Sequence, residues 1–135
     1  MGAVVSGLCC MIFYLASNWD SKSRLQPIAR DLRRLGHTVT STWLDEDEAQ
    51  NFDALTLDQQ LAYAHRDFDE IDAAQVLILD TLEQSLTGGR EVEVGYALRC
   101  FLPIWLVGPR RNIFHSVAIK RYPDWEHLLG LLRRA

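Results

Sequence analysis

Two glutamates directly behind a glycine pair have the clearest chemical potential in this chain. Gly88-Gly89 follows the apolar run 76–80, which is typical of a buried strand, and Glu91 and Glu93 fall in the first turn of a segment with helical composition. Backbone N–H groups at a helix start are unpaired and carry partial positive charge. They hold a carboxylate ionised or receive an anionic ligand. Because ligands of open α/β sheets bind at the carboxyl ends of the strands, an ionised Glu93 is a candidate nucleophile.

An alternation of apolar runs and amphipathic segments predicts the elements that position these glutamates. Strands are expected at 11–16, 38–44, 75–80, 103–107 and 117–121. Helices are expected at 25–32, 57–71, 89–100 and 125–132, where apolar residues or helical composition recur. Strands separated by helices predict a single-domain α/β fold: a doubly wound, flavodoxin- or Rossmann-like five-stranded parallel sheet with helices on both faces. Residues 1–10 are expected as an N-terminal tail and 11–135 as the domain.

Three local features refine this outline. Pro27 fits the first helix only within its first turn. Gly36 is placed as the stop of that helix. Residues 45–56 are acidic, polar and without periodicity, which predicts an active-site or surface loop.

Composition and charge limit the function classes. The 135 residues suit one domain, and 48% hydrophobic residues can build its core. A net charge of −4 argues against a nucleic-acid partner, which would usually need a basic surface. The apolar N-terminal run lacks a basic region and ends at Asn18-Trp19-Asp20, so neither a secretory signal nor a membrane span is predicted.

The three cysteines predict neither a metal site nor a disulfide framework. Cys9, Cys10 and Cys100 form no CxxC pair and have no histidines at zinc spacing. A reduced, cytoplasmic location is the simplest expectation. No cofactor signature is visible either, so we expect no metal and no cofactor.

Four places within residues 11–116 resemble the nucleoside 2-deoxyribosyltransferase family, in the family's order. They are Phe13-Tyr14-Leu15-Ala16 with Trp19, Asp67 ahead of 71–76, Gly88-Gly89 with 92–98, and Pro109 to Asn112 with Ile113-Phe114. The glycine segment resembles the family's catalytic signature and is moderately specific. The resemblance implies that 11–135 is a nucleoside 2-deoxyribosyltransferase-like domain.

The resemblance implies an enzyme that cleaves the N-glycosidic bond of a nucleoside. It implies that Glu93 attacks the anomeric carbon and that a second base, or water, resolves the covalent sugar–enzyme intermediate. A carboxylate suits this task because the sugar's transition state resembles an oxocarbenium ion. The leaving base needs a proton or a hydrogen bond, and the resemblance gives that role to Asp67. Tyr14 would orient Glu93.

Two further positions follow from the same resemblance. Trp19 would flank the base, where aromatic stacking adds about 0.5–1.5 kcal/mol beyond buried area. Asn112 would act across a dimer interface, in a neighbouring subunit's site. The expected partners are therefore a small nucleoside or nucleotide substrate and a second copy of the chain.

One departure from the family pattern bears on the substrate. Many members place an acidic residue a few positions before the glycines, where it contacts a sugar hydroxyl, but this chain has Ser85-Leu86-Thr87 there. The related 2-deoxynucleoside 5-monophosphate N-glycosidases carry a hydroxyl residue at this place, and they hydrolyse rather than transfer. A hydroxyl beside glycine N–H groups accommodates phosphate, whereas a carboxylate repels it. The hypothesis is a nucleotide substrate, contacted by Thr87, Gly88, Gly89 and Arg90.

Residue types alone also fit structural interpretations. Glu93 could be an ordinary glutamate that complements the helix dipole, and Asp67 could be a solvated helix residue. Tyr14 could be a core tyrosine with a satisfied hydroxyl. Asn112 could be a turn residue, and His115 is expected to be structural. In a simple doubly wound layout the end of helix 57–71 points away from the ligand edge, so Asp67 would reach the site only if that helix is short or bends.

Two other function classes compete with an enzyme of this family. A non-catalytic nucleotide-binding module would keep the fold and the pocket. Replacing Glu93 in such a module should change little. A flavin or dinucleotide protein is disfavoured, because Ala16-Ser17-Asn18 stands where a G-x-G-x-x-G turn would follow the first strand.

Overall fold

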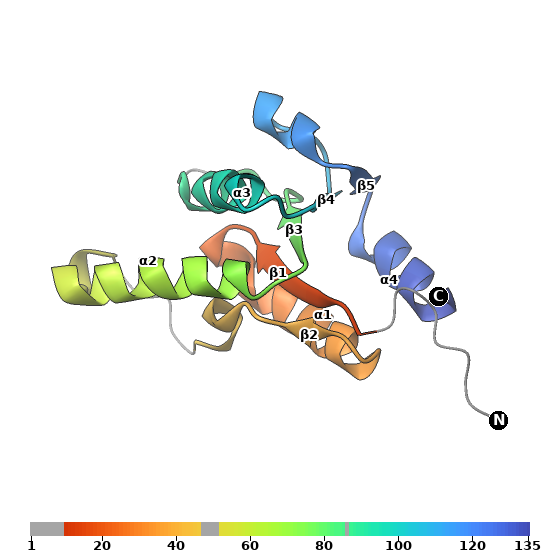
Figure 1. The fold of residues 1–135 in the computed structure, drawn as a ribbon, viewed down its shortest axis with the longest axis horizontal. Helices are drawn as coiled ribbons and strands as arrows, with labels where there is room; N and C mark the ends of the chain where they lie inside the picture. The colour runs from red at the N-terminus through yellow and green to blue at the C-terminus, as the bar shows by residue number, and fades with distance from the viewer. Residues whose placement is uncertain (1–9, 47–51, 86) are drawn as a thin grey trace.

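The sheet is five-stranded and wholly parallel. The computed structural model describes residues 10–46, 52–85 and 87–135. Its strands run in the order β2-β1-β3-β4-β5 (Figure 1). They are β1 (Ile12–Ala16), β2 (Thr38–Val39), β3 (Val76–Asp80), β4 (Ile104–Val107) and β5 (Lys120–Tyr122). This order confirms the α/β, flavodoxin-like architecture that the sequence predicts.

Four helices cover the two faces of the sheet. They are α1 (Lys22–Arg34), α2 (Leu57–Asp72), α3 (Gly89–Arg99) and α4 (Trp125–Arg134). α1 contacts α4, and α2 contacts α3. Parallel crossovers are right-handed. The chain moves one way from β1 to β2 and the other way from β2 to β4, which puts α1 on the face opposite to α2 and α3 (Figure 1).

The core lies on both faces of the central strands. β3 and β4 are buried along their whole length, and so are Phe13 to Ala16 of β1. Such continuous apolar strands are expected where helices cover both faces of a parallel sheet. Each fully buried Leu, Ile or Phe contributes about 1.5–3 kcal/mol relative to an exposed one. The central strands are therefore the rigid base of the ligand edge.

The strand order reverses between β1 and β3, and ligands of such sheets bind at that switch point. The loop after β1 leads into a short 3-10 helix, η1 (Trp19–Ser21), and the loop after β3 leads to the start of α3. Both carry residues predicted for the site, so the fold brings two distant segments to one edge.

α2 reaches this edge because it is long. Thr56 begins it with a capping box, accepting a hydrogen bond from the Gln59 N–H while the Gln59 side chain accepts from the Thr56 N–H. The 16 residues span roughly 24 Å at the α-helical rise. The N-terminal half of α2 extends past the carboxyl ends of the strands (Figure 1). Asp67 lies in the C-terminal half of α2, more than one turn before its last residue, and lines the cavity from there. The expectation that this would need a short helix was wrong.

The second strand is shorter than predicted. Residues 38–44 were expected as a strand, but β2 stops at Val39 and 42–45 form the 3-10 helix η2 (Thr42–Asp45). Side chains replace the missing ladder: the Leu15 N–H donates to Ser41 Oγ over 2.6 Å, and Trp43 Nε1 donates to the Leu15 carbonyl over 2.9 Å. Trp43 is thereby buried in the edge of the sheet.

Other boundaries differ in smaller ways. β5 lies at Lys120–Tyr122 rather than 117–121, because Ile113–Val117 form the 3-10 helix η4. Pro27 lies in the second turn of α1, on its exposed side, since α1 begins at Lys22 directly after η1. Gly36 follows α1 with φ +98°, which confirms the predicted helix stop.

Two predicted segments lie partly outside the described residues. Residues 1–9 of the expected tail are not described, and neither are 47–51 of the acidic loop. The described part of that loop contains η3 (Phe52–Ala54). In the part of the chain that the structure describes, no helix has the length and apolar character needed to cross a membrane.

Replacing Gly108 by alanine should destabilise the sheet's ligand edge. Gly108 follows β4 with φ +117°, and a Cβ there would lie 2.7 Å from Thr81 Oγ1 and 2.9 Å from the Leu82 nitrogen. We expect G108A to lower the free energy of unfolding by about 2–4 kcal/mol, from backbone strain and overpacking together.

Gly95→Ala is the matched control, measured in the same urea titration. Gly95 lies in α3, and a Cβ added there would meet nothing within 4 Å. This substitution should raise stability by roughly 1 kcal/mol through helix propensity. If G108A and the wild type unfolded at the same urea concentration, the close approach of Gly108 to Thr81 and Leu82 would be absent.

Candidate active site

A cavity of about 560 Å³ lies at the ligand edge, walled by the loop after β1, by η2, by α2 and by the start of α3. Six of the nine residues predicted for the site line it. They are Trp19, Asp67, Thr87, Gly89, Arg90 and Glu93. Tyr14 is joined to the same cavity through Glu93, whereas Gly88 and Asn112 are not among the lining residues.

Glu93 is bound to the centre of the sheet by Tyr14. The Tyr14 side chain is fully buried on β1, and its hydroxyl donates a hydrogen bond to Glu93 Oε2. α3 packs over β1, which brings the two residues together. Burial, followed by the neighbouring charge of Glu93, holds the pKa of Tyr14 far above its ordinary value. The hydroxyl therefore stays a donor and fixes one oxygen of Glu93.

The expectation that the helix start holds Glu93 ionised was wrong. α3 begins at Gly89, so Glu91 lies in the first turn and Glu93, the fifth residue, in the second. The dipole effect fades beyond the first turn. Burial instead raises the pKa of Glu93 from 4.5 to about 8; the Tyr14 hydrogen bond opposes this rise, and the charges of Asp67 and Glu70 add to it.

Asp67 faces the same cavity from α2. Burial raises its pKa from 3.8 to about 6, although Arg66 works in the opposite direction. The Arg66 guanidinium lies 3.2 Å from Asp67 Oδ1 and also pairs with Glu46. Asp67 can therefore exchange a proton near neutral pH. Two carboxyl groups with separated pKa values, on two helices, are a pattern typical of acid–base sites.

Aromatic side chains form the remaining walls. Trp19 and Trp43 lie with their ring centroids 5.8 Å apart, and Tyr63 and Phe68 join them from α2. Rings of this kind bind the face of a planar ligand. The sequence analysis missed Trp43, Tyr63, Phe68 and Arg66. The spacing of Tyr63, Asp67 and Phe68 on one helix was an available signal, whereas Trp43 stood within a predicted strand.

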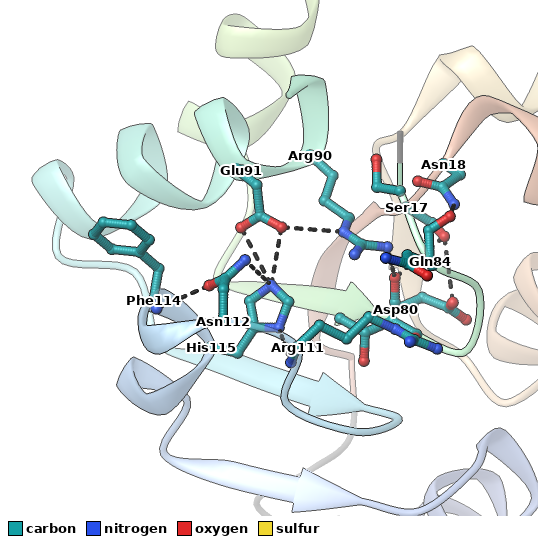
Figure 2. A network of polar contacts seen from close by, with 12 residues as sticks. Ser17, Asn18, Asp80, Gln84, Arg90, Glu91, Arg111, Asn112, Phe114 and His115 are labelled. Atoms are coloured by element: carbon teal, nitrogen blue, oxygen red, sulfur yellow. Dashed lines mark hydrogen bonds and ion pairs between the residues drawn. The ribbon is translucent and has the colours of Figure 1, made fainter. Parts of the chain in front are cut away.

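The residues before and within the start of α3 have different surroundings. Thr87 is exposed and lines the cavity beside Gly89, and Gly88 precedes the helix as its N-cap. Arg90 borders the cavity but is only 3% exposed. Its guanidinium donates to the carbonyls of Asp80 and Glu83 and to the Glu91 carboxylate (Figure 2). The side-chain charge of Arg90 is thus engaged within the protein.

Asn112 lies apart from Glu93 within this chain. Its side-chain oxygen accepts from the Phe114 N–H over 2.9 Å and caps η4, and its amide nitrogen lies 3.2 Å from His115 Nε2 (Figure 2). His115 is fully buried, with Nδ1 accepting from the Arg111 N–H and Nε2 bonded to Glu91. A role for Asn112 in a neighbouring subunit's site stays a prediction.

Metal ligation has no visible site in residues 10–46, 52–85 and 87–135. No group of three or more His, Cys, Asp or Glu side chains is placed there to hold an ion. The clustered carboxyl groups at the cavity are paired with Tyr14 and Arg66 instead.

Comparison with known proteins finds likeness in structure rather than in sequence. No family model matches the chain, and no curated protein matches it. A 2-deoxyribosyltransferase from Bacillus psychrosaccharolyticus has a similar structure, with a TM-score of 0.70 at 20% identity over 90% of this chain and 95% of that one. A CMP N-glycosidase from Clostridium botulinum gives 0.60 at 17% identity, over 90% and 98%.

A third similar structure is a conserved protein from Enterococcus faecalis V583, with a TM-score of 0.64 at 13% identity over 93% of this chain and 99% of that one. At such identities the likeness is one of fold. The chain has the fold of a known 2-deoxyribosyltransferase and a known CMP N-glycosidase, which confirms at that level the resemblance found in the sequence.

The raised pKa of Glu93 should make the protein less stable as the pH rises. In the folded protein the pKa of Glu93 is about 8, whereas its ordinary pKa is 4.5. The neutral carboxyl therefore contributes its full stabilisation below pH 4.5, and this contribution is lost as the pH rises through about 8. Glu93→Gln keeps the neutral form at every pH. We expect its melting temperature to exceed that of the wild type by about 5 °C or more near pH 9, and by little near pH 5.

Melting curves across this pH range measure the effect. Glu126→Gln is the control, because Glu126 is exposed on α4. Its curve should run parallel to that of the wild type. A parallel curve for Glu93→Gln would contradict the raised pKa.

Proposed function

We propose that this protein cleaves the N-glycosidic bond of a nucleoside or nucleotide, with Glu93 as the nucleophile. The observation that carries the proposal is the pairing of Glu93, oriented by Tyr14, with Asp67 on a second helix of one aromatic cavity. The 2-deoxyribosyltransferase and the CMP N-glycosidase that share the fold support this class of reaction. The expected domain, residues 11–135, belongs to the same proposal.

The first step forms a sugar ester on Glu93. The reacting state has the pair's proton on Asp67 and Glu93 ionised. One carboxylate oxygen of Glu93 then attacks the anomeric carbon, the C–N bond breaks with its electron pair moving to the base, and Asp67 gives the base its proton. The other carboxylate oxygen keeps the hydrogen bond from Tyr14. In the second step an incoming base, or water, attacks the anomeric carbon, returns a proton to Asp67 and releases Glu93.

Burial of Glu93 contributes to the rate in this scheme. The ionised carboxylate is poorly solvated, which is why its pKa is raised to about 8. Positive charge develops on the sugar in the transition state, a short distance from this carboxylate. Their attraction is therefore stronger in the transition state than with the neutral substrate, which is the condition for faster chemistry.

The aromatic walls suit the base. Trp19 and Trp43 form one part of the cavity wall, with their rings close together. Tyr63 and Phe68 contribute to the wall from α2. A purine or pyrimidine ring bound between such side chains would have its leaving nitrogen within the cavity that Asp67 also lines. The non-catalytic nucleotide-binding module remains the competing function class, and it requires no proton donor at Asp67.

A second candidate is hydrolysis of a nucleoside 5-monophosphate. Thr87 and Gly89 line the cavity at the start of α3, where first-turn N–H groups lack intrahelical partners. Residues 85–87 carry hydroxyls and no carboxylate. This end of the cavity suits a phosphate, and the CMP N-glycosidase of the same fold supports the alternative. Arg90 also lines the cavity, and two of its guanidinium nitrogens already donate within the protein. Its contact with the phosphate stays a prediction.

A homo-oligomer completes the proposal. Asn112 is exposed, and the neighbouring η4 side chains Ile113, Phe114 and Val117 are 78%, 60% and 37% exposed. An exposed apolar group of this kind usually marks an interaction site. If a second copy of the chain bound to this surface, Asn112 of the first copy would approach the cavity of the second. This is the role that the sequence resemblance implies.

The proposal predicts that Glu93→Gln abolishes turnover but preserves binding. A covalent nucleophile acts only along the reaction path, so the rate should fall by at least about a thousandfold while ligand affinity changes little. Deoxynucleosides and their 5-monophosphates are incubated with and without a free acceptor base, and the products are separated by chromatography.

Each outcome of this incubation has a distinct meaning. New nucleoside that forms only with the acceptor identifies a transferase, and free base without it identifies a hydrolase. Glu126→Gln should behave as the wild type. Turnover that survives Glu93→Gln would refute the assigned nucleophile, and binding without any turnover by the wild type would favour the binding module.

The phosphate alternative predicts a charge effect at Thr87. Thr87→Asp should raise KM for a 5-monophosphate by about tenfold or more through repulsion, and leave KM for the nucleoside nearly unchanged. Thr87→Ser keeps the hydroxyl and should leave both values near those of the wild type. Steady-state kinetics with the two substrates decides the point: equal or better use of the nucleoside by the wild type would remove this alternative.

A further inference from the structure

Five successive main-chain carbonyls, beginning at the last residue of β3, each accept a hydrogen bond from a side-chain N–H (Figure 2). The pairs are Asp80 with Arg90 (3.3 Å), Thr81 with Arg111 (2.7 Å), Leu82 with Arg111 (3.1 Å), Glu83 with Arg90 (3.0 Å) and Gln84 with Asn18 (2.8 Å). We call residues 80–84 the carbonyl loop. It belongs to no helix or strand beyond Asp80, so side chains replace the partners that a ladder would give.

The two arginines suit this task by their shape. Arg111 donates from Nε and one Nη to adjacent carbonyls, which matches the planar fork of a guanidinium. Arg90 reaches the carbonyls of Asp80 and Glu83 with one nitrogen and so closes the loop from the other side. A lysine ammonium is a single point charge on a flexible stem and cannot present the same fork.

The two arginines are also joined to each other. Glu91 accepts from Arg90 Nε over 3.3 Å and lies 2.9 Å from His115 Nε2. Because His115 Nδ1 accepts from the Arg111 N–H, Nε2 carries the proton and donates to Glu91. The contacts form a closed circuit, from the carbonyl loop through Arg90, Glu91 and His115 to Arg111 and back to the loop (Figure 2).

The carbonyl loop ends three positions before Thr87, a residue of the cavity wall. Thr87 and Gly89, which follow it, line the cavity, and Ser17 on the facing loop also donates to the Asp80 carbonyl. The shape of the loop thus sets where the wall of the cavity stands relative to Glu93. The hydrogen bonds of both guanidinium groups lead to the loop and to Glu91, so both arginines hold the loop.

We infer that Arg90 and Arg111 are positioning residues, which hold the carbonyl loop so that Thr87 and the start of α3 stand in place for the substrate. The inference rests on the proposed function only for its kinetic consequence; the ordering of the loop is a property of the protein alone. Arg90 and Arg111 act through the loop, and the hydrogen bond of Glu93 comes from Tyr14 rather than from either arginine.

Hydrogen exchange tests the ordering without any substrate. Arg111 is the better residue to replace, because its side chain is exposed. Arg90 is buried, and replacing Arg90 would also remove a hydrogen-bond donor from Glu91. In Arg111→Gln, amides in peptides covering residues 81–85 should exchange at least about tenfold faster, with α1 and α4 unchanged. Arg110→Gln, at the exposed neighbouring position, should match the wild type. Unchanged exchange in the loop, or equal acceleration throughout the chain, overturns the inference.

Kinetics tests the consequence for the site, with whichever deoxynucleoside or 5-monophosphate the wild type uses best. Arg111→Gln should raise KM by about tenfold while kcat stays within about threefold, since the chemistry at Glu93 is intact. Arg111→Lys should recover only part of the loss. Unchanged KM, or a large fall in kcat alone, overturns the positioning role. If the wild type turns over none of these compounds, the proposed function fails, and hydrogen exchange still decides whether the arginines order the loop.

Discussion

The hydrogen bond between Tyr14 and Glu93 joins the centre of the sheet to the helix that covers it. Tyr14 lies fully buried on β1, and Glu93 projects from α3 to the edge of the cavity. A carboxyl group in such a place needs a partner, because an unpaired buried polar group is strongly destabilising. The packing of α3 on β1 supplies this partner. The residues that line the cavity with Glu93 come from α2, from η2, from the loop after β1 and from the start of α3.

The same burial that orients Glu93 also limits the stability of the fold. A pKa raised to about 8 means that ionising this carboxyl opposes folding. Local conflicts of this kind are expected at functional sites. The nearby pair of Asp67 and Arg66 shows the same conflict in a weaker form, because the guanidinium offsets part of the desolvation of the carboxyl. The two carboxyl groups therefore occupy one cavity with distinct proton affinities, and near neutral pH the proton of the pair lies on Glu93. The proposed reaction starts from the other arrangement, with the proton on Asp67 and Glu93 ionised.

Sequence patterns predict the fold well because they report on burial. The apolar runs at 12–16, 76–80 and 104–107 correspond to the central strands, and the glycine pair marks the start of α3 at the switch point. Patterns fail where a distant side chain decides. Trp43 lies in η2 rather than in the predicted strand, and its Nε1 donates to the Leu15 carbonyl. Arg90 donates to two main-chain carbonyls that its place in the sequence did not indicate. The pKa of Glu93 also depends on tertiary burial, which no local spacing reports.

The most direct test of the account is to trap the sugar on Glu93. A deoxynucleoside and its 5-monophosphate, each carrying fluorine at the sugar's second carbon, destabilise the oxocarbenium-like transition states and slow release of the intermediate. Mass spectrometry after rapid acid quench, followed by peptide mapping, should find the mass of the sugar on the peptide with Glu93 and none in Glu93→Gln. Release of base without an adduct at any quench time, or an adduct on another residue, would contradict the assignment of Glu93 as the nucleophile.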